Sequence, residues 1–250
     1  MTDSSASTDE NINQTQLDDE WDDTPTALQL RAIFTFVAGA LLLWSQVRAP
    51  IDAHTQWSRF IWTSAWANFL LPLGIIWLFF AQTIRHQKSL SNQALNAWNY
   101  GWNFKSWKQS VLWSLIMTAA MLPILWFASR DSSTRSFYAS YYPSPESIGV
   151  GIFIGTIVLW MLFWEFFFRG FLLFGFAQAF SEKWAPFVAI PLQAALFGAA
   201  HIGKPPTEMY ASFIGGIVLG IVAWRQKSWL APFLTHAIVQ VVWAILVLRT

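Results

Sequence analysis

The chain has 250 residues, of which 55% are hydrophobic and 12% are charged, and its mean hydropathy is +0.39. A soluble globular protein is about half apolar but about a quarter charged, so this composition, with 17 Trp and 22 Phe, indicates a protein folded in a lipid bilayer. The formal net charge of +1 argues against a nucleic-acid partner, and the absence of cysteine excludes disulfides, thiolate catalysis and cysteine-ligated metals.

The N-terminal residues 1–29 form a polar segment rich in Ser, Thr, Asn and Gln, with acidic residues clustered around Trp21. A secretory signal peptide would instead begin with basic residues and continue into an apolar stretch. Because the segment has so little apolar surface to bury, we predict a disordered acidic tail that solvates the chain rather than docking a partner.

Seven later stretches are apolar over most of the roughly 20 residues that a helix needs to cross about 30 Å of hydrocarbon. They are residues 30–47, 60–82, 110–128, 149–179, 185–201, 208–224 and 229–248. We therefore predict an all-α protein, a polytopic transmembrane helical bundle of about seven spans, within a range of about six to eight. The sequence Gly203-Lys204-Pro205-Pro206 predicts a break between the fifth and sixth stretches, because proline removes a helix donor and restricts the residue before it.

Basic residues in the short loops predict the orientation, because Lys and Arg concentrate in cytoplasmic loops. The loop after the second stretch carries Arg85, Lys88, Lys105 and Lys108, and the loop after the sixth carries Arg225 and Lys227. With about seven spans, both loops lie on one side of the membrane. We expect a cytoplasmic N-terminus and a C-terminus on the opposite side.

Two glycine pairs with four-residue spacing predict close helix contacts, since the members of each pair stack on one helix face. They are Gly151 with Gly155 and Gly216 with Gly220. We expect a neighbouring helix to pack against each pair.

Two ionisable residues, Glu165 and Arg169, interrupt the apolar stretch from Gly149 to Phe180. Four residues apart on a helix, they share a face and can form an ion pair. A charge deep in a membrane costs several kcal/mol unless it is paired or faces a polar cavity. The pair therefore either fixes helix packing or belongs to a functional site.

Two further stretches carry polar groups at membrane depth. His201 ends the fifth stretch, and His236 and Gln240 share a face of the last one. Counted from the loops at about 1.5 Å per residue, Glu165 and His201 reach similar depths, whereas His236 is predicted roughly 10–15 Å nearer the basic loops. Polar groups from three helices indicate an interior polar site.

A carboxylate with two imidazoles is compatible with two kinds of chemistry. Glu165 could deprotonate a water molecule while the histidines and Gln240 stabilise an oxyanion, which is general-base hydrolysis. Alternatively, Glu165, His201 and His236 could hold a zinc ion with one open position for water. The sequence contains no HExxH motif, so the local spacing does not favour a metal, and we expect no cofactor.

Three short motifs combine these residues. The first reads Trp164-Glu165-Phe166-Phe167-Phe168-Arg169-Gly170, the second Phe197-Gly198-Ala199-Ala200-His201, and the third His236-Ala237-Ile238-Val239-Gln240. In order and spacing they resemble the motifs of the CPBP intramembrane proteases, the glutamic endopeptidase family of the CAAX prenyl protease and of bacteriocin-processing relatives. All three motifs lie in residues 149–250, which we interpret as the protease-like core, after N-terminal transmembrane helices and loops in residues 30–148.

The resemblance implies a membrane-embedded endopeptidase that hydrolyses a peptide bond with a glutamate-activated water and no required zinc. It implies that His201 holds the water, that His236 and Gln240 polarise the scissile carbonyl, and that Arg169 orients the glutamate motif. The implied partners are the lipid bilayer and a peptide or protein substrate at the membrane, such as a prenylated tail. The implied location is the inner membrane of a prokaryotic cell, and the sequence does not indicate an oligomeric state.

One departure from the family motif leaves two functions open. Trp164 stands where the family has the first of two glutamates, and Trp has no atom that can take a proton from water. Either Glu165 serves as the base, or the protein is an inactive scaffold or immunity-type relative that binds a membrane partner. Side chains converging on one pocket, with Trp164 pointing away, would favour hydrolysis. A transporter is a third interpretation, supported only by the break at 203–206.

Overall fold

A computed structural model of the chain describes residues 25–48, 52–86 and 100–248. Within these ranges the regular structure is helical and contains no strand, which confirms the predicted all-α membrane bundle. Most of the predicted acidic tail lies outside the described residues, but helix α1 already begins at Pro25, inside the predicted tail.

Six helical segments of the described chain are long and apolar enough to cross a membrane. They are α1 (Pro25–Arg48); α2 (Trp57–Ala65) continued by the π-helix η1 (Trp66–Leu70) and α3 (Leu71–His86); α4 (Trp107–Ala128); α7 (Val150–Glu165) continued by the π-helix η3 (Phe166–Phe174) and α8 (Gly175–Ala177); α10 (Pro206–Gln226); and α11 (Leu230–Leu248). A shorter apolar helix, α9 (Ala185–Ala199), precedes α10, and the short helices α5 (Ser132–Tyr141) and α6 (Pro145–Ile148) connect α4 to α7. The six long segments together with α9 correspond to the seven predicted stretches.

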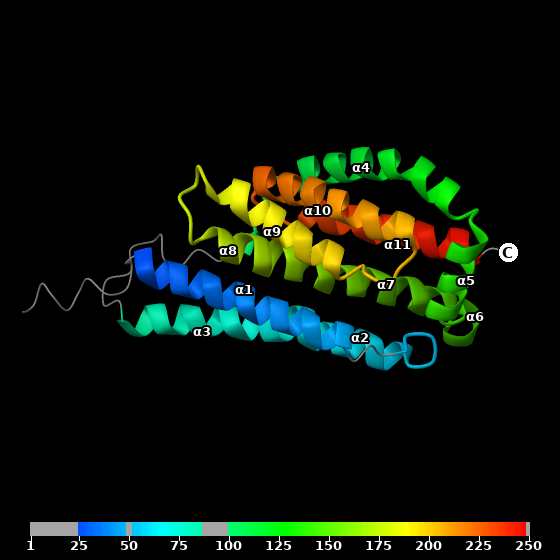
Figure 1. Cartoon of the computed structure of the whole chain (residues 1–250), viewed down its shortest axis with the longest axis horizontal. Coiled ribbons are helices and arrows are strands. Elements are labelled where there is room, and N and C mark those ends of the chain that lie inside the picture. Colours follow the sequence, from blue (N-terminus) through cyan, green and yellow to red (C-terminus); the bar gives the residue numbers. More distant parts are fainter. Residues whose placement is uncertain (1–24, 49–51, 87–99, 249–250) are drawn as a thin grey trace, which may run out of the picture.

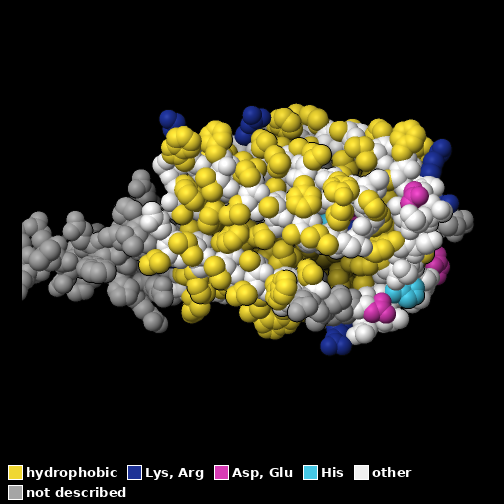
Figure 2. Space-filling model, in the orientation of Figure 1, with side chains coloured by type: hydrophobic (Ala, Val, Ile, Leu, Met, Phe, Trp, Pro, Cys, Tyr) yellow, Lys and Arg dark blue, Asp and Glu magenta, His cyan; other side chains and the backbone are white. Residues whose placement is uncertain are grey.

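The long helices run side by side along one axis of the molecule, and α1 begins at the end opposite to that at which α11 ends (Figure 1). Helix α11 packs against α4 and α7, α9 packs against α10, and α2 packs against α7. The flank of this bundle is largely covered by hydrophobic side chains, and acidic side chains gather at the end where α5 and α6 lie (Figure 2). An apolar flank is the surface that a membrane bundle exposes to lipid.

The helix boundaries follow from local residues. The predicted break between the fifth and sixth stretches is confirmed, since α9 ends at Ala199 and α10 begins at Pro206, where a missing N–H is tolerated. Gly149, with φ 86°, supplies the left-handed turn before α7. Asp131 caps α5 by accepting a hydrogen bond of 2.8 Å from the backbone N–H of Thr134.

The two glycine pairs differ. A Cβ at Gly216 would lie 3.0 Å from Ala194, and one at Gly220 would lie 2.7 Å from Nε2 of Gln193, so this pair allows α10 to approach α9 as predicted. The contact predicted for Gly151 and Gly155 is wrong in the described part of the chain, because a Cβ at either would meet nothing within 4 Å. Helix α7 buries its other face, which carries Phe153, Ile157 and Trp160.

The turn between α10 and α11 lies deep in the bundle. The backbone N–H of Trp229 donates to the carbonyl of Gly101 over 3.4 Å. The Trp229 ring lies 5.1 Å from the Trp102 ring and 6.1 Å from the Phe166 ring, measured between centroids. The first residues of α11 are therefore level with the start of η3, which places the polar face of α11 beside Glu165.

Candidate active site

Glu165 and Arg169 form the ion pair that their spacing predicts. Nη1 of Arg169 donates to Oε1 of Glu165 over 2.9 Å, and neither side chain is exposed. Glu165 is the last residue of α7, and Arg169 lies in the π-helix η3. Such i→i+5 segments within α-helices are frequent at functional sites.

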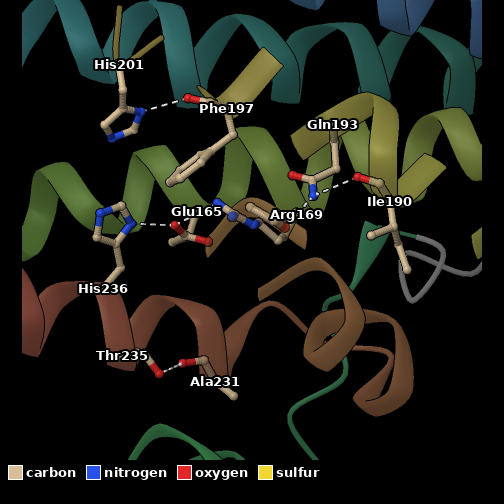
Figure 3. A network of polar contacts seen from close by, with 10 residues as sticks. Glu165, Arg169, Ile190, Gln193, Phe197, His201, Ala231, Thr235 and His236 are labelled. Carbon is tan, nitrogen blue, oxygen red and sulfur yellow. Dashed lines mark hydrogen bonds and ion pairs between the residues drawn. The ribbon is translucent and has the colours of Figure 1, made fainter. Parts of the chain in front are cut away.

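His236 completes this cluster from α11. Its Nδ1 donates to Oε1 of Glu165 over 2.6 Å (Figure 3), because a carboxylate can only accept. The prediction that His236 lies roughly 10–15 Å nearer the basic loops than Glu165 does is wrong. The loop count assumed that all turns on the basic side are level, whereas Trp229 draws the α10–α11 turn inward against Trp102.

His201 reaches the cluster through the ring of Phe197, the first residue of the second motif. Nδ1 of His201 donates to the carbonyl of Phe197 over 2.7 Å. The Phe197 ring lies 4.7 Å from the His201 ring and 5.8 Å from the His236 ring, and Cζ of Arg169 lies 4.2 Å from its centroid. Phe197 thus packs between the Glu165 pair and His201, so only His236 of the two histidines has a hydrogen bond to Glu165 (Figure 3).

A cavity of about 490 Å³ adjoins the cluster. Trp164, His201, His236 and Gln240 line it, whereas Glu165 lies behind His236 and takes no part in the wall. Helices α1, α2 and α5 supply much of the opposite side, including Gln46, Phe60 and Tyr141.

Trp164 faces this cavity, so the condition that it point away, which would have favoured hydrolysis, is not met. Its ring centroid lies 6.1 Å from that of His201 and 6.3 Å from that of Trp160. Successive helix residues are rotated by about 100°, so Trp164 and Glu165 cannot face the same way. Glu165 points into the protein, and the aromatic ring takes the cavity-facing position.

Gln240 lines the cavity, and its side chain has a hydrogen bond to a residue that belongs to none of the three motifs. Its Nε2 donates to the hydroxyl of Tyr142, which follows α5. The sequence gives no signal for Tyr142, because the contact joins residues 98 positions apart.

The buried ion pair retains unsatisfied polar atoms. Oε2 of Glu165 and Nε and Nη2 of Arg169 are buried without a hydrogen-bond partner among the described residues. Each such atom costs about 1–3 kcal/mol or more when charged. A buried ion pair is weak evidence for stability, and an ionisable pair at membrane depth is a candidate functional site.

The rim of the cavity carries a second ion pair. Nζ of Lys204, a lining residue, lies 2.7 Å from Oε1 of Glu208, whose Oε2 accepts from the hydroxyl of Tyr138. Burial, followed by the charge of Glu208, raises the pKa values of Tyr138 and Tyr141, so both phenols stay protonated at neutral pH.

The described residues contain no group of side chains that could bind the zinc ion of the alternative chemistry. Among them, no three side chains of His, Cys, Asp or Glu are grouped closely enough to hold a metal ion. The rings of His201 and His236 both lie near the Phe197 ring, and two imidazoles do not by themselves form a zinc site.

Comparison with known families gives one match. The model of the family described as type II CAAX prenyl endopeptidase Rce1-like matches residues 145–242. The match covers less than half of the chain, and this part of it is similar to the Rce1-like family. No curated protein and no solved structure matches the chain.

The Rce1-like match includes all five residues predicted for the site, namely Glu165, Arg169, His201, His236 and Gln240. It confirms the resemblance to CAAX-type proteases. Tyr142 and the cavity walls formed by α1 and α2 lie outside it.

Proposed function

We propose that the protein is an intramembrane endopeptidase in which the Glu165–His236 pair activates water. The observation that carries the proposal is the 2.6 Å contact of Nδ1 of His236 with Oε1 of Glu165, made by a histidine that also lines the cavity. With Nδ1 donating to the carboxylate, the neutral imidazole has its lone pair on Nε2, on the other side of the ring.

His236 takes the base role better than Glu165 itself. Glu165 has no exposed surface, whereas the His236 side chain is 14% exposed and lines the cavity. Nε2 of His236 removes the proton of a water as the water oxygen attacks the scissile carbonyl carbon. Glu165 stabilises the imidazolium that results, and Arg169 holds the Glu165 carboxylate in place.

The other motif residues act on the water and on the carbonyl. His201 donates from Nδ1 to Phe197, so its Nε2 accepts a hydrogen bond and can orient the water. The amide of Gln240 donates to the carbonyl oxygen as it becomes an oxyanion. The imidazolium then gives its proton to the leaving nitrogen, the C–N bond breaks, and a carboxylic acid and an amine are released, which become a carboxylate and an ammonium group when the carboxyl proton passes to the amine.

The family match supports a proposal for the substrate class. The family description names CAAX prenyl endopeptidases, and we propose a membrane-associated or prenylated peptide as the substrate of this chain. We propose that the protein lies in the inner membrane of a prokaryotic cell with its N-terminus in the cytoplasm. We also propose that catalysis does not require zinc.

A cleavage assay in proteoliposomes tests the proposal. The full chain is reconstituted with an internally quenched peptide that ends in a prenylated cysteine tail, and fluorescence reports cleavage. We expect Glu165→Gln and His236→Ala each to lower kcat about 10²–10⁴-fold. The matched control Glu182→Gln, at an 85% exposed side chain, keeps the wild-type rate. Wild-type rates in both site variants would overturn the proposal.

One observation favours a second function, a binding protein that does not cut. Trp164 occupies the cavity wall where the family motif has a glutamate. If this function is right, the wild type binds the prenylated peptide without cleaving it, and Trp164→Glu introduces cleavage. Cleavage by the wild type removes this alternative.

A further inference from the structure

The last residue of the third motif has a side chain one methylene longer than its counterpart in the family. The structure shows a contact that can hold this longer side chain in place. The family has Asn where this chain has Gln240, and a longer side chain loses more rotamer freedom when it is fixed. A flexible amide is a poor oxyanion donor, because electrostatic stabilisation requires donors that are already oriented. Gln240 therefore needs an anchor.

Tyr142 has the geometry of such an anchor. Its hydroxyl accepts a hydrogen bond from Nε2 of Gln240. An amide nitrogen carries two N–H groups, so one remains for a substrate carbonyl in the cavity that Gln240 lines. We infer that Tyr142 is a positioning residue, which orients the amide of Gln240 toward the scissile carbonyl.

The phenol ring itself is immobilised from several sides. It is 1% exposed, stacks on the Tyr138 ring at 5.6 Å and meets the Phe153 ring edge-on at 5.7 Å. The backbone carbonyl of Tyr142 also accepts from Nδ1 of His54 over 2.6 Å. These contacts fix the hydroxyl oxygen independently of Gln240.

The chemistry of the hydroxyl suits the role. Burial raises the pKa of Tyr142 well above its usual value, so the group stays neutral. A neutral hydroxyl accepts the amide N–H without placing a negative charge next to the developing oxyanion. A carboxylate at this position would oppose the reaction.

The inference rests on the proposed function, and a double-mutant cycle tests it. Tyr142→Phe removes the hydroxyl and keeps the ring that packs on Tyr138 and Phe153. In the proteoliposome assay we expect about a tenfold fall in kcat with KM within about twofold. Tyr210→Phe, which removes a hydroxyl from a 66% exposed side chain, is the matched control and keeps the wild-type kcat.

The second half of the cycle separates positioning from packing. In the Gln240→Asn background the side chain is too short to reach the hydroxyl, so Tyr142→Phe has less than about a twofold effect there. An equal loss of kcat in both backgrounds, or no loss in the Gln240 protein, overturns the inference. A wild type that binds the peptide without cleaving it overturns the proposed function instead.

Discussion

Two ion pairs with the same spacing lie near the cavity, one of which contacts the lining residue His236 while the other includes the lining residue Lys204. Glu165–Arg169 is 2.9 Å long and Lys204–Glu208 is 2.7 Å long, and each joins residues four apart on the chain. Each carboxylate also accepts from a second helix, Glu165 from His236 and Glu208 from Tyr138. The pairs differ in burial: both side chains of the first are unexposed, whereas those of the second are 18% and 25% exposed.

From this difference we predict that burial, rather than the N–O distance, decides how much each pair contributes. The rim pair is partly solvated and contributes as surface pairs do. The side chains of the deep pair have no contact with solvent, so water screens the interaction of the Glu165 carboxylate with His236 less than it screens the second pair. Two polar atoms of Arg169 and one of Glu165 have no hydrogen-bond partner among the described residues, so this pair is weak evidence for stability.

Removing one cation from each pair gives the largest expected difference. Arg169→Leu leaves the Glu165 carboxylate buried beside His236 without its guanidinium, so we expect a loss of about 3–5 kcal/mol in unfolding free energy. Lys204→Leu should cost at most about 1 kcal/mol, because Glu208 keeps partial solvation and Tyr138. Unfolding in mild detergent measures both, and equal losses would contradict the role assigned to burial.

A charge swap of the deep pair separates packing from chemistry. Glu165→Arg with Arg169→Glu restores opposite charges, so we expect part of the stability lost in Arg169→Leu to return. Cleavage should stay at least about 10²-fold below wild type, because a guanidinium would then face His236 in place of the carboxylate. A swap that restores the cleavage rate would show that the pair serves packing alone.

Local spacing was sufficient to predict the Glu165–Arg169 pair. The other features of the site depend on packing between residues far apart in the chain, which the sequence pattern does not predict. The i, i+4 spacing of Glu165 and Arg169 and the motif order were sufficient to place both on one face of one helix. The depth of His236 was predicted wrongly because it depends on Trp229 packing against Trp102, more than 100 residues away in the chain. Neither the contact of Tyr142 with Gln240 nor the inward turn of Trp164 follows from periodicity, since both depend on how the helices are rotated.

Neutralising the carboxylate of the rim pair is expected to have a small effect on catalysis. In Glu208→Gln the amide keeps the side-chain shape and a hydrogen bond to Tyr138, so kcat should stay within about twofold of wild type. The same substitution at Glu165 is the comparison. If Glu208→Gln lowered kcat as much as Glu165→Gln does, Glu208 rather than Glu165 would have to be assigned to the catalytic site.

Chelation has the smallest expected effect. No group of three metal-binding side chains is found in the described chain, so EDTA or 1,10-phenanthroline should leave the cleavage rate unchanged. Loss of activity on chelation and its recovery on adding zinc would require a metal at His201 or His236.

The central claim is that Glu165 and His236 act as one catalytic unit, and a double-mutant cycle on the cleavage rate tests it most directly. If Glu165 acts through His236, adding Glu165→Gln to His236→Ala lowers kcat by less than about twofold further. If the two losses multiply, each residue acts on the substrate by itself, and the assignment of His236 as the base supported by Glu165 is contradicted.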